Sequence, residues 1–152
     1  MKIAILLPYK EDYTAKYAGA VSIHVSNLYE YSKYKKYIFI YGSTNENKYL
    51  TSNYINFSIN SNFLASNNNK YLTKFIIDQK NDESDIIEIH NRPNYVKRIF
   101  NNLKSKIILY FHNNPLTISG STSKNERLYL LDKCEYIFFN SNWTKNQFFK
   151  NI

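Results

Sequence analysis

The sequence predicts an α/β protein in which helices cover both faces of a mostly parallel sheet. Short apolar runs rich in β-branched and aromatic residues alternate with segments whose apolar residues recur at helical spacing. This alternation is typical of parallel strands joined by helices. Several runs are continuously apolar, as in strands that are buried on both faces. At 152 residues the chain is most simply one domain, residues 1–152, with an ordinary hydrophobic core.

Six runs are predicted to be strands. The first is stopped by Pro8 and the second is closed by Gly42, whereas the third alternates like a strand near the sheet edge. The predicted strands are Lys2–Leu7, Tyr37–Tyr41, Tyr54–Ile59, Asp85–Ile89, Ile107–Phe111 and Tyr136–Phe139.

Helices are predicted between these strands. Apolar residues at helical spacing predict an amphipathic helix over Gly19–Ser32. Pro93 suits the first turn of a later helix, and Ser123-Lys124-Asn125-Glu126 matches a capping box. Ser141 is predicted to cap a last short helix, and the Asn- and Ser-rich stretch Asn60–Asn69 is predicted to be irregular.

The positive charge comes almost entirely from lysine. The net charge is +8, but the arginines are few: Arg92, Arg98 and Arg127. Base readout and bidentate phosphate clamps favour arginine, so nucleic acid is not an expected partner. The lysines are scattered apart from Lys33-Tyr34-Lys35-Lys36, which favours a solvated surface. Attraction to an anionic membrane leaflet or to phosphorylated substrates is the functional alternative.

The single cysteine, Cys134, permits no internal disulfide, which suits a reducing compartment. It is interpreted as a small buried hydrophobic residue and not as a nucleophile. Metal-ligand spacing is absent, and no apolar run approaches the ~18 residues of a membrane span. We therefore expect a cytoplasmic chain without a metal or other cofactor, loosely peripheral to the inner membrane face.

Two predicted strands end in a histidine followed by an asparagine. Ile107–Phe111 runs into His112-Asn113, and Asp85–Ile89 runs into His90-Asn91-Arg92. Ligands of open α/β sheets bind at the carboxyl ends of the strands, so both imidazoles are expected in one crevice. There they could bind a sugar hydroxyl or a phosphate, or carry a proton. Either histidine alone is better explained by bonding to its loop, but the pair favours a ligand-facing role.

The remaining candidates are a glycine and several charged residues. Gly19, before the first helix, would let a phosphate approach the helix N-terminus, but a plain turn glycine fits equally well. The full Gly-x-Gly-x-x-Gly fingerprint of dinucleotide-binding proteins is missing. His24, inside this helix, is interpreted as structural, and the carboxylates available are Glu11, Asp12 and Glu88. Arg92 suits an anionic ligand and is equally consistent with a surface arginine.

Four stretches together resemble a known family. Gly19–Leu28 reads Gly-Ala-Val-Ser-Ile-His-Val-Ser-Asn-Leu and Asp85–His90 reads Asp-Ile-Ile-Glu-Ile-His. The strand ending in His112-Asn113 and the stretch Tyr136–Ser141 follow. In this order they resemble the family-four (group 1) glycosyltransferases of the GT-B fold, which carry Gly-Gly-Val-Ser-x-His-Val-x-x-Leu and Asp-Val-Val-His-x-His. His112–Gly120 is similar to members that build lipopolysaccharide or capsule.

The resemblance implies a Rossmann-like N-terminal domain that shapes the acceptor site and faces the donor across an interdomain cleft. The complete enzyme would move a sugar, with retention, from a nucleotide-sugar to a glycan or glycolipid acceptor of cell-surface polysaccharide. Carried over, Gly19 and Ala20 form the donor-binding loop, and His112 is the catalytic contact with the donor sugar. The residues implied to face the cleft or acceptor are His90, Asn91, Arg92 and Asn113.

Two departures from the family pattern qualify this expectation. Ala20 replaces the second glycine of the loop. The C-terminal nucleotide-sugar domain of the family, with its Glu-x7-Glu motif, is absent from these 152 residues. The chain alone is therefore expected to be inactive and to need that domain in cis or in trans.

Two other functions stay open. One is a non-enzymatic, Lys-rich α/β module that docks on an anionic membrane or a protein partner. The other is a nucleotide-dependent oxidoreductase or epimerase, against which the missing fingerprint glycines argue.

Overall fold

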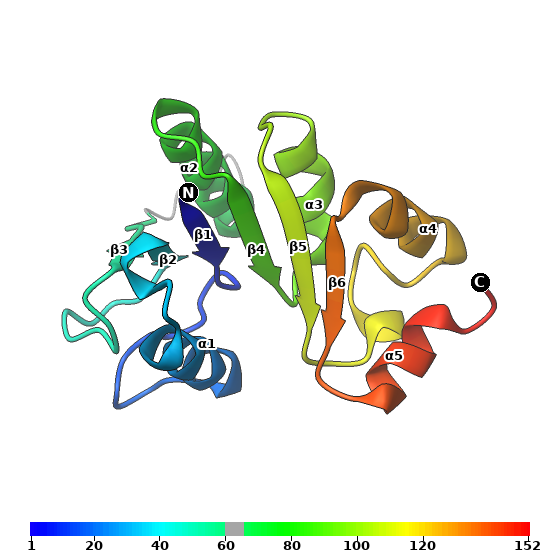
Figure 1. The fold of residues 1–152 in the computed structure, drawn as a ribbon, viewed down its shortest axis with the longest axis horizontal. Helices are drawn as coiled ribbons and strands as arrows, with labels where there is room; N and C mark the ends of the chain where they lie inside the picture. Colours follow the sequence, from blue (N-terminus) through cyan, green and yellow to red (C-terminus); the bar gives the residue numbers. More distant parts are fainter. Residues whose placement is uncertain (60–65) are drawn as a thin grey trace.

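The computed structural model, which describes residues 1–59 and 66–152, has the α/β fold that the sequence predicts (Figure 1). The described residues form six strands: β1 (Ile3–Leu6), β2 (Ile38–Gly42), β3 (Tyr54–Asn56), β4 (Ile86–His90), β5 (Lys106–Phe111) and β6 (Tyr136–Phe139). They make one all-parallel sheet in the order β3-β2-β1-β4-β5-β6. The expected Rossmann-like architecture is confirmed, with β3 at one edge.

The α-helices of the described residues also follow the prediction. They are α1 (Ala20–Tyr31), α2 (Asn67–Asn81), α3 (Pro93–Phe100), α4 (Lys124–Lys133) and α5 (Asn142–Phe149). Pro93 opens α3, Ser141 caps α5 and the Ser123–Glu126 capping box opens α4, as expected. Of the stretch predicted to be irregular, residues 60–65 lie outside the described residues, and its last three residues are already helical. Two short 3-10 helices, Lys35–Tyr37 and Pro115–Thr117, were not predicted.

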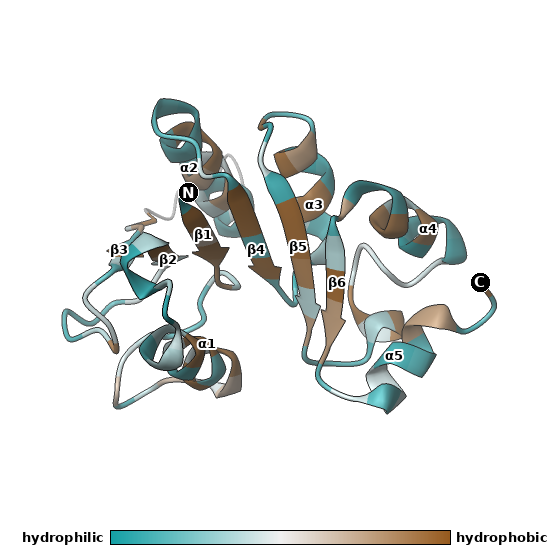
Figure 2. Ribbon diagram, viewed as in Figure 1, coloured by the Kyte–Doolittle hydropathy of each residue, from teal (hydrophilic) through white to brown (hydrophobic). Residues whose placement is uncertain are grey.

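The helices are divided unequally between the two faces of the sheet. Connections from β1 to β2 and from β4 to β5 run in opposite directions along the sheet, and right-handed crossovers therefore place their helices on opposite faces. Apolar residues of α1 pack against Ile5, Leu7 and Ile40. Those of α2, α3 and α4 pack against the other face, which carries Leu6 and Ile89. Figure 2 shows the mostly apolar character of β1, β4 and β5 between these layers.

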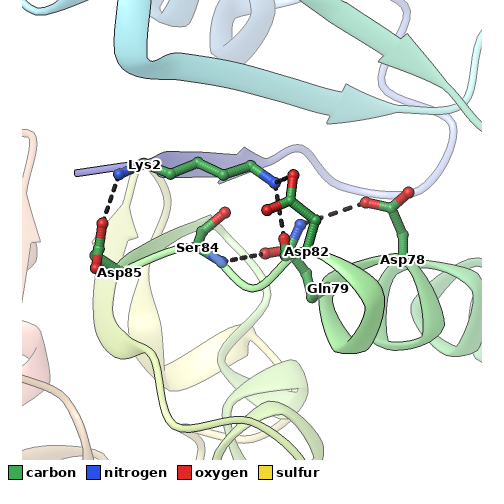
Figure 3. A network of polar contacts seen from close by, with 6 residues as sticks. All are labelled: Lys2, Asp78, Gln79, Asp82, Ser84 and Asp85. Carbon is green, nitrogen blue, oxygen red and sulfur yellow. Dashed lines mark hydrogen bonds and ion pairs between the residues drawn. The ribbon is translucent and has the colours of Figure 1, made fainter.

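A polar network ties the amino ends of β1 and β4 together (Figure 3). The Lys2 backbone N–H donates to the Asp85 carboxylate at 2.6 Å, and Lys2 Nζ donates to the Asp82 carbonyl and carboxylate at 2.7 and 2.8 Å. The buried Gln79 side chain accepts from the Ser84 N–H at 3.0 Å. These contacts fix the turn between α2 and β4 at the end of the sheet opposite to the carboxyl ends of the strands.

Tyr71 of α2 ties the carboxyl ends of β1 and β2. Its ring is fully buried, and its hydroxyl lies 2.9 Å from the Leu7 carbonyl and 3.1 Å from the Tyr41 carbonyl. The Tyr41 carbonyl also accepts from the Leu7 N–H at 3.0 Å. The Tyr71 hydroxyl therefore satisfies the Leu7 carbonyl, which has no backbone partner at this end of the sheet.

Replacing Tyr71 with phenylalanine should destabilise the fold without changing its core volume. The Leu7 carbonyl then loses its hydrogen bond in a buried position, which costs about 1–3 kcal/mol. Urea denaturation measures this difference in the free energy of unfolding. Tyr31→Phe is the matched control, because Tyr31 is 90% exposed and should unfold like the wild type. A Tyr71→Phe protein as stable as that control would contradict the proposed role of the hydroxyl.

Candidate functional site

The candidate site lies where the strand order reverses, between β1 and β4. The chain leaves β1 toward β2 on one side, whereas it leaves β4 toward β5 on the other. Ligands of open α/β sheets bind outside the carboxyl ends of the strands at such a point. His90 is the last residue of β4, and the loop after β1 reaches α1 at Gly19. Figure 1 shows α1 near the arrowheads of the strands, at this same end.

His90 links a carboxylate to the second strand-end histidine. Its ring is fully buried, with Nε2 2.7 Å from Glu88 Oε1 and Nδ1 2.8 Å from His112 Nε2. Glu88 shares a face of the sheet with His90 because side chains two residues apart on a strand point the same way. Tyr110 is in register with His90, so His112, two residues further along, reaches this face too. The structure thus brings the two predicted histidines together.

Aromatic rings enclose this pair. Tyr110 stacks on His112 with ring centroids 4.5 Å apart and on His90 at 5.4 Å. His24 of α1 meets His112 edge-on at 5.1 Å, and its Nε2 is buried without a hydrogen-bond partner. The sequence interpretation of His24 as structural did not place it here. The contact of His24 with His112 depends on the rotation of α1 about its axis, which the helical spacing alone leaves undetermined.

The imidazoles of His112 and His24 are uncharged near neutral pH. Burial, with smaller contributions from His90 and His24, lowers the pKa of His112 to about 4, and Glu88 opposes this shift. Burial and His90 lower the pKa of His24 as well, again opposed by Glu88. Both rings are therefore neutral at pH 7, and each keeps one ring nitrogen with a lone pair.

Asn91 holds the loop after β5. It has a left-handed φ of 52° and only 5% exposure, a conformation that asparagine tolerates better than most residues. Its side-chain oxygen accepts from the backbone N–H groups of His112 and Asn113 at 3.0 and 3.3 Å. Asn91 thus places His112, and this oxygen already serves the backbone. The cleft-facing role expected for Asn91 stays a prediction.

Arg92 and Asn113 flank the histidine pair. Arg92 precedes the first turn of α3, and its Nη1 donates to the Asn91 carbonyl at 2.8 Å. Asn113 is exposed directly after His112. Both lie at the carboxyl ends of the central strands, where they were expected, and their contacts with a ligand stay predictions.

The close approach of the Glu11 carboxylate explains why residue 19 is a glycine. Its φ of −78° is open to any residue, but a Cβ atom there would lie 2.6 Å from Glu11 Oε1. The same oxygen accepts from the Ser22 N–H in the first turn of α1 at 3.2 Å. Glu11 therefore occupies the positive end of this helix, where a bound phosphate was one of the two interpretations of Gly19. Ala20, the other residue of the expected donor loop, is exposed beside it.

A polar pocket of about 580 Å³ opens at the carboxyl ends of β1, β2 and β3. Its lining includes Tyr9, Asp12, Asn45 and Asn56. This pocket was not predicted from the sequence, although its signal is the same as for the histidines, namely polar residues after a buried strand. The pocket adds sugar-compatible groups to this end of the sheet, since amides and carboxylates bond hydroxyls and an aromatic ring packs on apolar surface.

Cys134 carries no chemistry at this site. Burial raises the pKa of its thiol to about 12, so the thiolate that would act as a nucleophile is not populated near neutral pH. The side chain packs against the core on the α2–α4 face, as expected for a small hydrophobic residue, but it is only half-buried.

Comparisons with known proteins do not assign a family. No protein-family model matches the sequence, and a search of curated proteins finds no match. Within residues 1–59 and 66–152, no helix is long and apolar enough to cross a membrane. In the same residues no three His, Cys, Asp or Glu side chains are grouped to hold a metal ion. Membership of the glycosyltransferase family therefore stays a prediction from the motifs.

A double-mutant cycle tests why residue 19 is glycine. Gly19→Ala should displace the Glu11 carboxylate from the Ser22 N–H and cost about 1 kcal/mol, the usual loss of a helix cap. In a Glu11→Ala background the same change meets no carboxylate and should be neutral or slightly stabilising, because alanine restricts the unfolded chain. The measured quantity is the interaction energy between the two changes in chemical denaturation. Strict additivity would show that the close approach of Glu11 to Gly19 has no energetic weight.

The buried histidines predict a loss of stability in acid. An unfolded histidine titrates near pH 6.5, whereas the pKa of folded His112 is about 4. Between these values the unfolded chain binds more protons, so stability falls as the pH falls. The Tm of His112→Gln should therefore decrease less steeply over this window than that of the wild type. Asn113→Ala, at the exposed neighbour, should keep the wild-type slope, and equal slopes for all three proteins would contradict the lowered pKa.

Proposed function

We propose that this chain is the N-terminal, acceptor-side part of a retaining glycosyltransferase. The complete enzyme moves a sugar from a nucleotide-sugar to a glycan or glycolipid in cell-surface polysaccharide synthesis. The observation that carries the proposal is the environment of His112, a neutral imidazole at the carboxyl end of β5. Its Nδ1 has no hydrogen-bond partner among the described residues and is not among their fully buried polar atoms. A lone pair so placed suits a sugar hydroxyl.

The arrangement of the motif residues supports the same proposal. The resemblance implies that the loop before α1 and the histidine after β5 approach one donor. In the structure, α1 begins directly after Gly19, and its His24 lies against His112. The two segments are about ninety positions apart in the sequence, yet they border one site. A chance resemblance in two unrelated loops does not require this proximity.

The position of Glu11 refines the donor side of the proposal. An anionic phosphate approaching the first turn of α1 meets the Glu11 carboxylate at Gly19. The two negative charges would repel each other. We therefore assign the diphosphate chiefly to the C-terminal domain and the sugar to this chain. The polar pocket beside Tyr9 and Asn56 is the proposed place of the acceptor glycan. Docking on an anionic membrane stays the untested alternative to a solvated, lysine-rich surface.

Sugar transfer by the complete enzyme tests the proposal. The chain joined to its C-terminal domain should bind a nucleotide-sugar in calorimetry and transfer the sugar to a glycan acceptor. His112→Ala should lower transfer about 10- to 100-fold, the equivalent of losing a hydrogen bond of about 1.5–3 kcal/mol. Lys124→Ala, on the exposed first turn of α4, should transfer like the wild type. A complete protein that binds no nucleotide-sugar, or a His112→Ala protein of full activity, overturns the assignment.

A further inference from the structure

We propose that Glu88 and His90 are positioning residues that fix the tautomer of His112, so that His112 Nδ1 is a hydrogen-bond acceptor at neutral pH. The three side chains form one line of contacts, from Glu88 Oε1 through both nitrogens of His90 to His112 Nε2. The line itself depends only on these distances. The proposed function enters at one point, where the group that donates to Nδ1 is identified as a sugar hydroxyl.

The direction of the line is set at Glu88. A carboxylate can accept hydrogen bonds but cannot donate them. The contact of 2.7 Å between Glu88 Oε1 and His90 Nε2 therefore requires the hydrogen on His90 Nε2. A neutral imidazole carries one hydrogen, so Nδ1 of neutral His90 presents a lone pair.

The second contact transmits this direction to His112. His90 Nδ1 and His112 Nε2 lie 2.8 Å apart, and the lone pair on the first requires a hydrogen on the second. His112 is then the Nε2-protonated tautomer, and its Nδ1 carries the free lone pair. A ligand hydroxyl can donate to this atom, whereas a deoxy or ether group at the same place cannot.

Ring packing fixes the planes of both imidazoles. Tyr110 lies nearly parallel to His90 and His112, at interplanar angles of 8° and 17°. His24 meets the His112 ring edge-on at 77°. A rotated His90 would turn carbon atoms toward its partners and leave two nitrogens unpaired in a fully buried position, which is costly.

Besides Glu88 and His90, the titratable groups that face His112 are His24 and Tyr110, and no hydrogen bond joins either to Nδ1. Among the described residues, His112 Nδ1 is therefore left open to a ligand.

Nitrogen NMR on the 152-residue chain tests the tautomer directly. The chain has three histidines, so long-range proton–nitrogen spectra of ¹⁵N-histidine-labelled protein can be assigned with single histidine substitutions. At neutral pH, His112 Nε2 should give a protonated, pyrrole-type shift and Nδ1 an unprotonated, pyridine-type shift.

Glu88→Gln tests the origin of the direction. Glutamine can accept from His90 Nε2 or donate to it, so His112 should lose its single tautomer and its Nδ1 shift should move toward the protonated value. Glu135→Gln, an exposed change at a residue paired with Lys106, should leave the His112 spectrum unchanged. A pyrrole-type Nδ1 in the wild type at neutral pH, or a Glu88→Gln spectrum identical to the wild type, overturns the proposal.

The two proposals fail in different experiments. The tautomer of His112 is measured without a nucleotide-sugar, so the expected NMR result supports the positioning roles of Glu88 and His90 even if the complete protein binds no such donor. Transfer activity in a protein whose His112 is protonated at Nδ1 would overturn these positioning roles and leave the proposed function intact.

Discussion

The candidate site depends on the pairing register of β4 with β5. Side chains two residues apart share one face of a strand, so this register places Glu88, His90 and His112 on the face that carries α1. The intervening Ile89 and Leu109 are fully buried on the opposite face. A slip of one residue would exchange the apolar and polar sets. The burial of two isoleucine- and leucine-rich strand faces thus enforces the distance between the histidines.

The sequence was informative where the fold depends on local pattern. Apolar runs predicted every strand of the described sheet, and strand-end polarity predicted that His90 and His112 would meet, because carboxyl ends of parallel strands share one edge. β3 ends earlier than predicted, since the Asn56 side chain bonds both backbone groups of Thr44. At Thr44 the Asn56 side chain thus replaces the backbone hydrogen bonds of a longer strand. This replacement depends on a loop conformation that hydrophobic periodicity does not encode.

Contacts between segments account for the rest of what the sequence left undetermined. From the sequence, Glu88 could be exposed on a polar face or buried with a partner. The structure shows that it is paired with His90. Gly19 was open between a turn and a ligand loop, whereas the structure shows the carboxylate of Glu11 against it. His24 depends on how α1 rests on the sheet. For Gly19 and His24 the deciding atoms lie across a loop or on another element, beyond the reach of a local pattern, whereas the partner of Glu88 lies two residues further along the same strand.

The direction of the hydrogen-bond line rests on a residue at which this chain differs from the motif that it resembles. In Asp-Val-Val-His-x-His the position of Glu88 is a histidine, which can donate as well as accept. A histidine there could support either tautomer of His90, and hence of His112. A carboxylate supports one while His90 is neutral. The open half of this sheet face, where Phe138 and Tyr136 are 46% and 60% exposed, leaves His112 partly accessible. Partial burial keeps the ring neutral, and Glu88 determines which of its nitrogens faces a ligand as an acceptor.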